Sequence, residues 1–228
     1  MTGITVNTIG EHKIIVAVIF IAVVGSAVFF ALNDSSPNRI TGHVTTTSVT
    51  IVGFVPFNCS FSLSSGMNMV SFPCIPLYEN VSTVLAPIND SVYAIFYYDP
   101  LDSADPWKSY NPALPSWATQ QLTELSRASG YIIIMNQSAA YFLAGSRKYT
   151  TIQTVPGWNM IAYPGLSSSA VNSTFGSLSF TILRTYDPST GQWLTYIPGS
   201  SGNTLTILEP YTGYWMQTNI SQSLNIAP

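Results

Sequence analysis

The residues best suited to catalysis are few in this sequence and lie far apart. The two histidines, His12 and His43, both precede residue 57. A Ser/His/Asp or Cys/His set needs a histidine beside its nucleophile. No Gly-rich phosphate loop, His-Glu-x-x-His zinc motif or EF-hand pattern occurs. We therefore predict that the protein is not an enzyme and has no catalytic site, metal site or cofactor.

Three carboxylates cluster in one segment, at Asp99, Asp102 and Asp105. Together with backbone carbonyls they are the ligands that calcium prefers, and two of them could form a glycosidase pair. Nothing nearby in the sequence would raise the pKa of one carboxyl. We interpret the segment as a solvated, turn-forming loop.

The two cysteines, Cys59 and Cys74, are separated by fifteen positions. A lone pair of cysteines in an extracytoplasmic domain most often forms a disulfide. Closing a loop of this length stabilises the fold by about 3 kcal/mol in chain-entropy models. The alternative is a pair of buried thiols.

Asn-x-Ser/Thr sequons recur through residues 57–228 and carry no proline at the middle position. There are six of them, at Asn58, Asn80, Asn89, Asn136, Asn172 and Asn219. Glycans at several would place this region outside the cytoplasm and solvate a surface with few charges. Alternatively, Asn and Ser serve here only as turn residues.

An internal duplication is the most informative pattern in the sequence. Six motifs of the first copy recur in order in the second, at offsets that fall from 91 to 83 residues. The pairs are Gly66–Pro73 with Gly157–Pro164, Tyr98–Pro100 with Tyr186–Pro188, Trp107–Tyr110 with Trp193–Tyr196, Leu122–Leu125 with Leu205–Leu208, Gly130–Tyr131 with Gly213–Tyr214, and Asn136–Ser138 with Asn219–Ser221. The falling offset predicts two homologous domains with small loop deletions in the second.

Short apolar segments bounded by Gly, Pro, Asp and Ser predict strands in each copy. In the first copy the strands are expected near 60–63, 67–72, 92–98, 107–110, 131–135 and 140–143. In the second they are expected near 151–154, 158–163, 180–186, 192–196, 214–218 and 223–226. Short helices are predicted over 81–85 and 170–175, with Asn80 and Ser169 as N-caps.

The duplicated aromatic pairs are Trp107 with Tyr110 and Trp193 with Tyr196, and Trp117 lies nearby. Aromatic rings on a strand could stack on sugars. Packing in a core or between domains is the better-supported interpretation, because duplication copies core positions automatically. The four residues remain candidates for a sugar or interface contact.

An uncharged, strongly apolar run of nineteen residues extends from Ile14 to Leu32. As a helix it would be about 28 Å long, close to the thickness of a bilayer core. Lys13 on the N-terminal side favours a cytoplasmic N-terminus. A signal peptide cleaved near Gly25-Ser26-Ala27 and a pilin-type helix are the alternatives, and both fit the sequence less well.

The low content of charged residues restricts the classes of partner. Charged residues make up 7% of the chain and the net charge is −3. Nucleic-acid binding needs clustered Lys and Arg, so we exclude it.

Residues 33–56, which include the β-prone stretch Val44–Val52, could be a stalk, an added edge strand or a strand donated to a neighbour.

The segment Gly157-Trp-Asn-Met-Ile-Ala-Tyr-Pro164 and the later Gly213-Tyr-Trp215 resemble the G-W-N start and G-Y-W end of small β-domain repeats in archaeal and bacterial envelope proteins. The first copy departs from that pattern, with Met67 and Ile132 where tryptophans would stand. The resemblance implies a non-catalytic extracellular role. The composition is similar to that of structural proteins of thermoacidophilic archaea and their viruses.

We therefore predict a mainly β protein with an N-terminal transmembrane helix and two tandem, small β-sandwich-like domains. The predicted parts are an inner tail (1–13), the helix (14–32), a stalk or donor strand (33–56) and the β domains (57–146 and 147–228). The expected function is that of a single-pass surface glycoprotein with a structural role in an archaeal envelope or virion. Its expected partners are the lipid bilayer, further copies of itself and other surface or virion proteins. The alternative is a cell-surface adhesin or carbohydrate-binding module.

Overall fold

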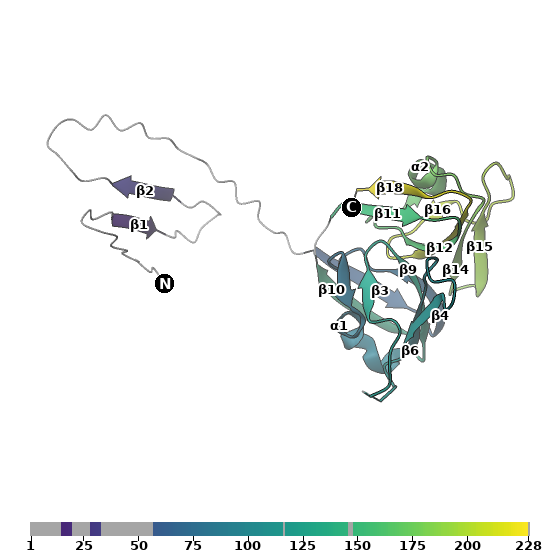
Figure 1. Cartoon of the computed structure of the whole chain (residues 1–228), viewed down its shortest axis with the longest axis horizontal. Coiled ribbons are helices and arrows are strands. Elements are labelled where there is room, and N and C mark those ends of the chain that lie inside the picture. The colour runs from purple at the N-terminus through teal and green to yellow at the C-terminus, as the bar shows by residue number, and fades with distance from the viewer. Residues whose placement is uncertain (1–14, 20–27, 33–56, 116, 146–147, 228) are drawn as a thin grey trace. The chain divides into compact units, whose positions relative to one another are not determined.

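A computed structural model describes residues 15–19, 28–32, 57–115, 117–145 and 148–227. The chain divides into two units, residues 1–55 and 56–228, and the second contains most of the described elements (Figure 1). The predicted inner tail (1–13) and the predicted stalk or donor strand (33–56) lie outside the described residues.

In the first unit, the described residues are two short strands, β1 (Ile15–Ile19) and β2 (Val28–Leu32). They pair antiparallel, with Ile15 opposite Leu32 and Ile19 opposite Val28. These residues were predicted to be helical, and the structure differs there. Ile, Val and Phe favour strands, and hydropathy alone does not distinguish a buried helix from buried strands. No helix among the described residues is long and apolar enough to span a membrane.

The first copy in the second unit is built on a four-stranded antiparallel sheet in the order β4-β9-β6-β7. Its strands are β4 (Gly66–Ser71), β6 (Val92–Tyr98), β7 (Trp107–Tyr110) and β9 (Gly130–Met135). Two further pairs complete it, namely β3 (Phe57–Leu63) with β10 (Ala139–Gly145) and β5 (Tyr78–Asn80) with β8 (Glu124–Ser126). The helix α1 (Val81–Leu85) and the 3-10 helix η1 (Ala86–Ser91) lie between β5 and β6.

The second copy repeats this arrangement strand for strand. Its four-stranded sheet has the order β12-β17-β14-β15, made by β12 (Gly157–Ala162), β14 (Ile182–Asp187), β15 (Gln192–Tyr196) and β17 (Gly213–Thr218). The additional pairs are β11 (Thr150–Thr154) with β18 (Gln222–Ile226) and β13 (Ser169–Ala170) with β16 (Ile207–Leu208). The helix α2 (Val171–Phe175) corresponds to α1. The fold is thus mainly β, with two sheet groups that resemble a duplication.

Each strand predicted in residues 57–228 is confirmed, although several ends are shifted by one to three residues. Asn80 is confirmed as the N-cap of α1, since its side-chain oxygen accepts a hydrogen bond from the Ser82 amide at 2.9 Å. The prediction of Ser169 as a cap is wrong. Ser169 pairs with Leu208 in β13, so α2 begins later and has Ala170 at its N-cap.

A shared turn explains why Gly-x-Asn begins the first strand of each four-stranded sheet. Gly66 has φ +85° and Gly157 has φ +104°, a backbone region that favours glycine. Two residues later, a buried asparagine closes the turn with its side chain. Asn159 accepts from the Val155 amide at 2.9 Å and donates to the Val155 carbonyl at 2.8 Å, and Asn68 makes the same two bonds with Ser64.

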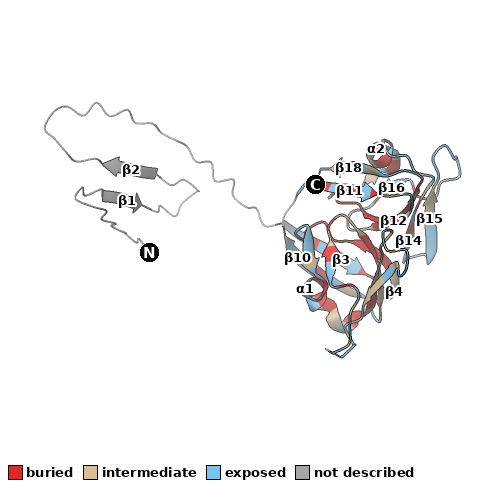
Figure 2. Cartoon of the chain, viewed as in Figure 1, coloured by how far each residue is buried: buried red, intermediate tan, exposed pale blue. Residues whose placement is uncertain are grey.

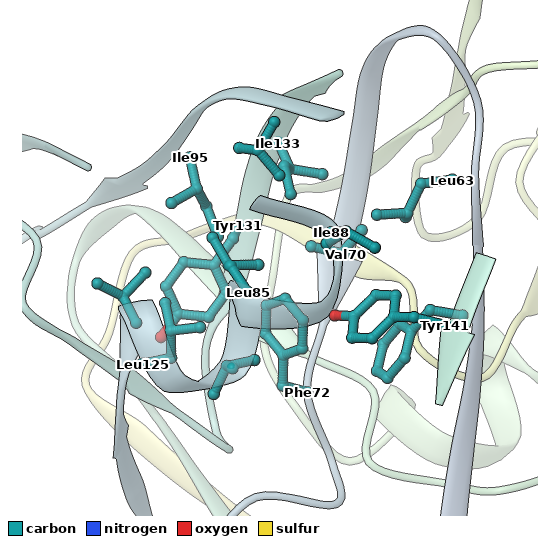
Figure 3. Close-up of a cluster of buried hydrophobic side chains, with 14 of the residues drawn as sticks. Leu63, Val70, Phe72, Leu85, Ile88, Ile95, Leu125, Tyr131, Ile133 and Tyr141 are labelled. Atoms are coloured by element: carbon teal, nitrogen blue, oxygen red, sulfur yellow. The ribbon is translucent and has the colours of Figure 1, made fainter. Parts of the chain in front are cut away.

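The core of the first copy lies between its four-stranded sheet and a second layer made by β3, β10 and α1 (Figures 2 and 3). Phe61 of β3 stacks on Tyr141 of β10 at a centroid distance of 4.9 Å. Phe72 and Tyr131 follow at 5.8 Å, and Leu85 of α1 is fully buried in the same cluster. Burial of this apolar surface is the main force that holds the layers together.

The second copy has its own core, in which Phe175, Leu183, Tyr214 and Met216 are fully buried. In both copies a central strand of the sheet begins with Gly-Tyr, and the tyrosine is buried. The Tyr131 hydroxyl accepts from the Ser126 amide, and the Tyr214 hydroxyl accepts from the Glu209 amide at 2.7 Å. The repeated motif therefore fixes the same contact in each core.

The two copies pack against each other through reciprocal contacts. The Ser71 amide donates to the Tyr211 carbonyl at 2.7 Å, and the Ala162 amide donates to the Ala128 carbonyl at 3.0 Å. These are the same contact with the copies exchanged, because Ser71 corresponds to Ala162 and Ala128 corresponds to Tyr211. Such reciprocity defines an isologous interface with approximate two-fold symmetry. The duplicated halves, predicted as tandem domains, share one compact unit.

Two glycines lie where the copies meet. A Cβ atom on Gly130 would lie 2.6 Å from the Ile161 carbonyl oxygen, and one on Gly213 would lie 2.6 Å from the Val70 carbonyl oxygen. Each contact again mirrors the other. Glycine is therefore needed at both positions for the close approach of the two backbones.

Candidate functional site: sequons, disulfide and an aromatic face

The three carboxylates of the acidic loop, Asp99, Asp102 and Asp105, form local hydrogen bonds and one ion pair. Asp102 forms an ion pair with Lys108 at 2.6 Å, and the hydrogen bond from Lys108 lowers the pKa of the Asp102 carboxyl. Asp99 accepts from the Leu101 amide at 2.9 Å, and Asp105 accepts from the Gln121 side chain at 2.7 Å. Among the described residues, no group of three or more His, Cys, Asp or Glu side chains could hold a metal ion.

The disulfide prediction is confirmed. Cys59 of β3 is bonded to Cys74, which follows β4, and both side chains are buried. The bridge joins β3 to the segment that follows β4. A disulfide of this kind is typical of oxidising, extracytoplasmic environments.

The six sequon asparagines all lie at or near the surface of residues 56–228. Asn89 is half-buried, and the other five, Asn58, Asn80, Asn136, Asn172 and Asn219, are exposed. They lie on strands, turns and the ends of short helices in both copies. A further sequon, Asn33-Asp34-Ser35, was missed in the sequence reasoning and lies outside the described residues.

The aromatic pairs are divided between two faces of each sheet. Trp107 and Trp193 are 39% and 45% exposed. Tyr110 and Tyr196 instead pack against the two hydrophobic cores. A spacing of three residues on a strand places side chains on opposite faces. The tryptophan and the tyrosine of each pair therefore do not lie on the same surface.

A cluster of four rings extends across the junction of the two copies. Trp215 of the second copy lies 5.4 Å from Trp107 and 5.7 Å from Tyr98 of the first, measured between ring centroids. Trp158 meets Trp215 edge-on at 5.7 Å. Trp107 is therefore an interface contact, which was one of the two interpretations of the aromatic pairs. Trp158 and Trp215 were missed as site residues, although Trp158 lies within the repeated Gly157–Pro164 motif and Trp215 directly follows the repeated Gly213–Tyr214.

Beside this cluster, Trp158, Arg184, Trp193 and Trp215 line a shallow hollow of ≈ 220 Å³. Tyr186 supports Trp193 edge-on at a centroid distance of 5.7 Å. The rings are thus held by other rings, which limits their movement. The hollow combines aromatic faces with one exposed guanidinium.

A larger hollow, ≈ 530 Å³, lies between the copies and has Arg127 in its wall. Arg127 is 5% exposed and donates to the Thr150 hydroxyl at 3.0 Å and the Ile75 carbonyl at 3.2 Å. Burial lowers the pKa of its guanidinium. These bonds tie the start of the second copy to the first, so we assign Arg127 a structural role.

Comparison with known proteins found no matching family model, no similar curated protein and no similar solved structure.

Proposed function

We propose that the protein is a non-catalytic surface glycoprotein with a structural role in an archaeal envelope or virion. The observation that carries the proposal is the position of the sequons on a disulfide-bonded β unit. Five of the six asparagines are exposed and none belongs to either core. Glycans at these sites would leave the packing of residues 56–228 undisturbed.

The scarcity of charge supports the same proposal. Charged residues make up 7% of the chain, whereas about 25% is usual for soluble proteins. Glycans are strongly solvated and would supply the missing polarity. A surface of this kind is also suited to close packing with further copies and with other surface proteins, because like-charge repulsion is small.

We further propose that residues 14–32 anchor the protein in a bilayer as a single helix. An isolated pair of strands leaves backbone groups unpaired at both edges, and such groups are costly in lipid. A helix satisfies all but its terminal groups internally. The strand pairing of β1 and β2 would then give way to a helix when the nineteen apolar residues enter the membrane.

Glycopeptide mapping by mass spectrometry tests the glycoprotein proposal on protein purified from its native source. We expect added hexose masses on at least two of the six sequon peptides, and a disulfide-linked peptide that contains Cys59 and Cys74. Unmodified asparagines at all six sites, together with free thiols, would reject the proposal. Peptides that contain Asn68 or Asn159, which are buried and outside sequons, are the internal control.

A further inference from the structure

The hollow on the second copy receives one side chain from each strand of its sheet. Trp158 comes from β12, Trp215 from β17, Arg184 from β14 and Trp193 from β15. Strand register places them on one face: Arg184 pairs with Trp215, and Trp193 pairs with Tyr186, two residues from Arg184. The opposite face of the same sheet carries Leu183 and Met216 into the core.

The equivalent face of the first copy differs in chemistry. The positions that correspond to Trp158, Arg184 and Trp215 are occupied by Met67, Phe96 and Ile132, and only Trp193 has a tryptophan counterpart, Trp107. Packing within one copy therefore does not require the Trp-Arg-Trp combination, although Trp158 and Trp215 also belong to the ring cluster at the junction of the copies. The combination belongs to the second copy alone and surrounds a hollow rather than filling it.

Arg184 restricts the chemistry of a ligand. It is exposed, and the only ion pair within the described part of the chain joins Lys108 and Asp102. A cationic group in the hollow would be repelled by the guanidinium, which excludes an aromatic cage for ammonium ligands. Arg184 offers hydrogen-bond donors and no acceptor, so the ligand must supply oxygen acceptors.

The tryptophans restrict the shape of the ligand. The negative face of an aromatic ring attracts weakly positive C–H groups, so the ligand must present a flat C–H surface beside its oxygens. A pyranose ring has both features. At ≈ 220 Å³ the hollow is smaller than the pockets of about 300–1,000 Å³ that hold drug-sized molecules, which suits a single ring.

Other aromatic-binding ligands fit less well. A proline-rich peptide extends about 3.1 Å per residue and needs a groove that several residues can follow, whereas four side chains line this hollow. Single-stranded nucleic acid needs a basic track beside the stacking rings, and the net charge of the chain is −3. A proline-rich peptide and an ammonium ligand serve as alternative outcomes of the test.

We propose that Trp158, Arg184, Trp193 and Trp215 form a binding site for one pyranose ring of a glycan. The ring stacks on the exposed face of Trp193, and Arg184 donates hydrogen bonds to its hydroxyl oxygens. The site is independent of whether the protein itself carries glycans, so it goes beyond the proposed function. In a surface lattice it would let one molecule hold the sugars of another.

The test titrates the full chain, in a detergent without a sugar headgroup, with methyl pyranosides of glucose, galactose, mannose and N-acetylglucosamine. Binding is followed by the indole signals of ¹⁵N-labelled tryptophan. We expect saturable shifts of the Trp193 signal with at least one sugar, at a dissociation constant on the order of 1 mM. A proline-rich peptide and choline are titrated in parallel.

Trp193→Ala and Arg184→Gln should each weaken the binding at least tenfold. Trp117→Ala is the matched control, because Trp117 is 84% exposed and lies outside the hollow. Circular dichroism verifies that each variant is folded. The proposal is overturned if no pyranoside shifts the Trp193 signal, if Trp193→Ala and Trp117→Ala bind equally, or if only the peptide or choline binds.

Discussion

Asn68 and Asn159 show how one side chain can determine the start of a strand. Each is 3% exposed, and each bonds to the amide and carbonyl of the residue four positions earlier. The Gly-x-Asn motif thereby satisfies backbone groups that the strand ladder leaves unpaired. Their recurrence in both copies follows from this local requirement.

Removal of one asparagine should destabilise the fold. We predict that Asn159→Ala lowers the free energy of unfolding by about 1–3 kcal/mol, because the Val155 amide and carbonyl lose their partners while partly buried. Urea denaturation measures the change. Asn225→Ala, at an exposed position, should change stability by less than about 0.5 kcal/mol. Equal losses for the two variants would contradict the role assigned to Asn159.

The buried hydroxyl of Tyr141 leads us to predict a loss of stability at alkaline pH. Burial raises the pKa of its hydroxyl well above the ordinary value near 10, and this hydroxyl has no hydrogen-bond partner within the described part of the chain. Above about pH 10 the folded state keeps the proton of the Tyr141 hydroxyl, whereas the unfolded state releases it. The titration of Tyr141 therefore does not lower the free energy of unfolding below about pH 10, but it lowers this free energy increasingly as the pH rises further.

Tyr141→Phe removes this titration without removing a hydrogen bond. We predict that it leaves stability at about pH 8 unchanged or higher, and that it recovers about 1.4 kcal/mol of the loss seen at about pH 11. Thermal unfolding across this pH range measures both effects. Tyr149→Phe, at an exposed position, is the control, and an equal effect of the two variants would refute the prediction.

At the scale of elements, most of residues 57–228 could be predicted from sequence. Short apolar segments bounded by Gly, Pro, Asp and Ser indicated the twelve longer strands, and a capping Asn80 indicated α1. The short strands β5, β8, β13 and β16 were missed, because segments of two or three residues are too short to show a hydrophobic periodicity. The helix over 14–32 was predicted from length and hydropathy, whereas the described residues of this segment, 15–19 and 28–32, form strands.

The junction of the copies is an element-scale feature that sequence did not indicate. It depends on the backbones of Gly130 and Gly213, and a repeated glycine could equally have served a turn. We predict that Gly130→Ala and Gly213→Ala each lower the free energy of unfolding by about 1–3 kcal/mol, because the added methyl group would overlap a carbonyl of the other copy.

The two glycine variants should have similar effects, since their contacts are reciprocal. Gly202→Ala is the control. Its added carbon would meet nothing closer than the Ser200 hydroxyl at 3.9 Å, so stability should change by less than about 0.5 kcal/mol. Chemical denaturation of all three variants measures this. A loss in only one of Gly130→Ala and Gly213→Ala would contradict the symmetric junction.

At the scale of the whole molecule, the duplication has two consequences. It builds one compact unit from two copies of a small fold, and the sheet faces that point away from the two cores carry different side chains. The candidate sugar site exists because Trp158, Arg184 and Trp215 differ from their counterparts. Sequence reasoning drew attention to the repeated Trp107 and Trp193, whereas the site depends on residues that the copies do not share.

The exposed sequons and the buried disulfide bear on where residues 56–228 reside. Five exposed asparagines and a cystine suit an oxidising exterior. The apolar segment 14–32 would hold this unit at a membrane, and further copies would assemble beside it there. Location on the outer side of the membrane is the claim on which the proposed function rests.

Gold labelling of intact native cells or particles, with antibodies against residues 56–228, tests that claim most directly. We predict dense labelling of the outer surface before permeabilisation, with no increase afterwards. Labelling that appears only after permeabilisation would contradict the proposed function.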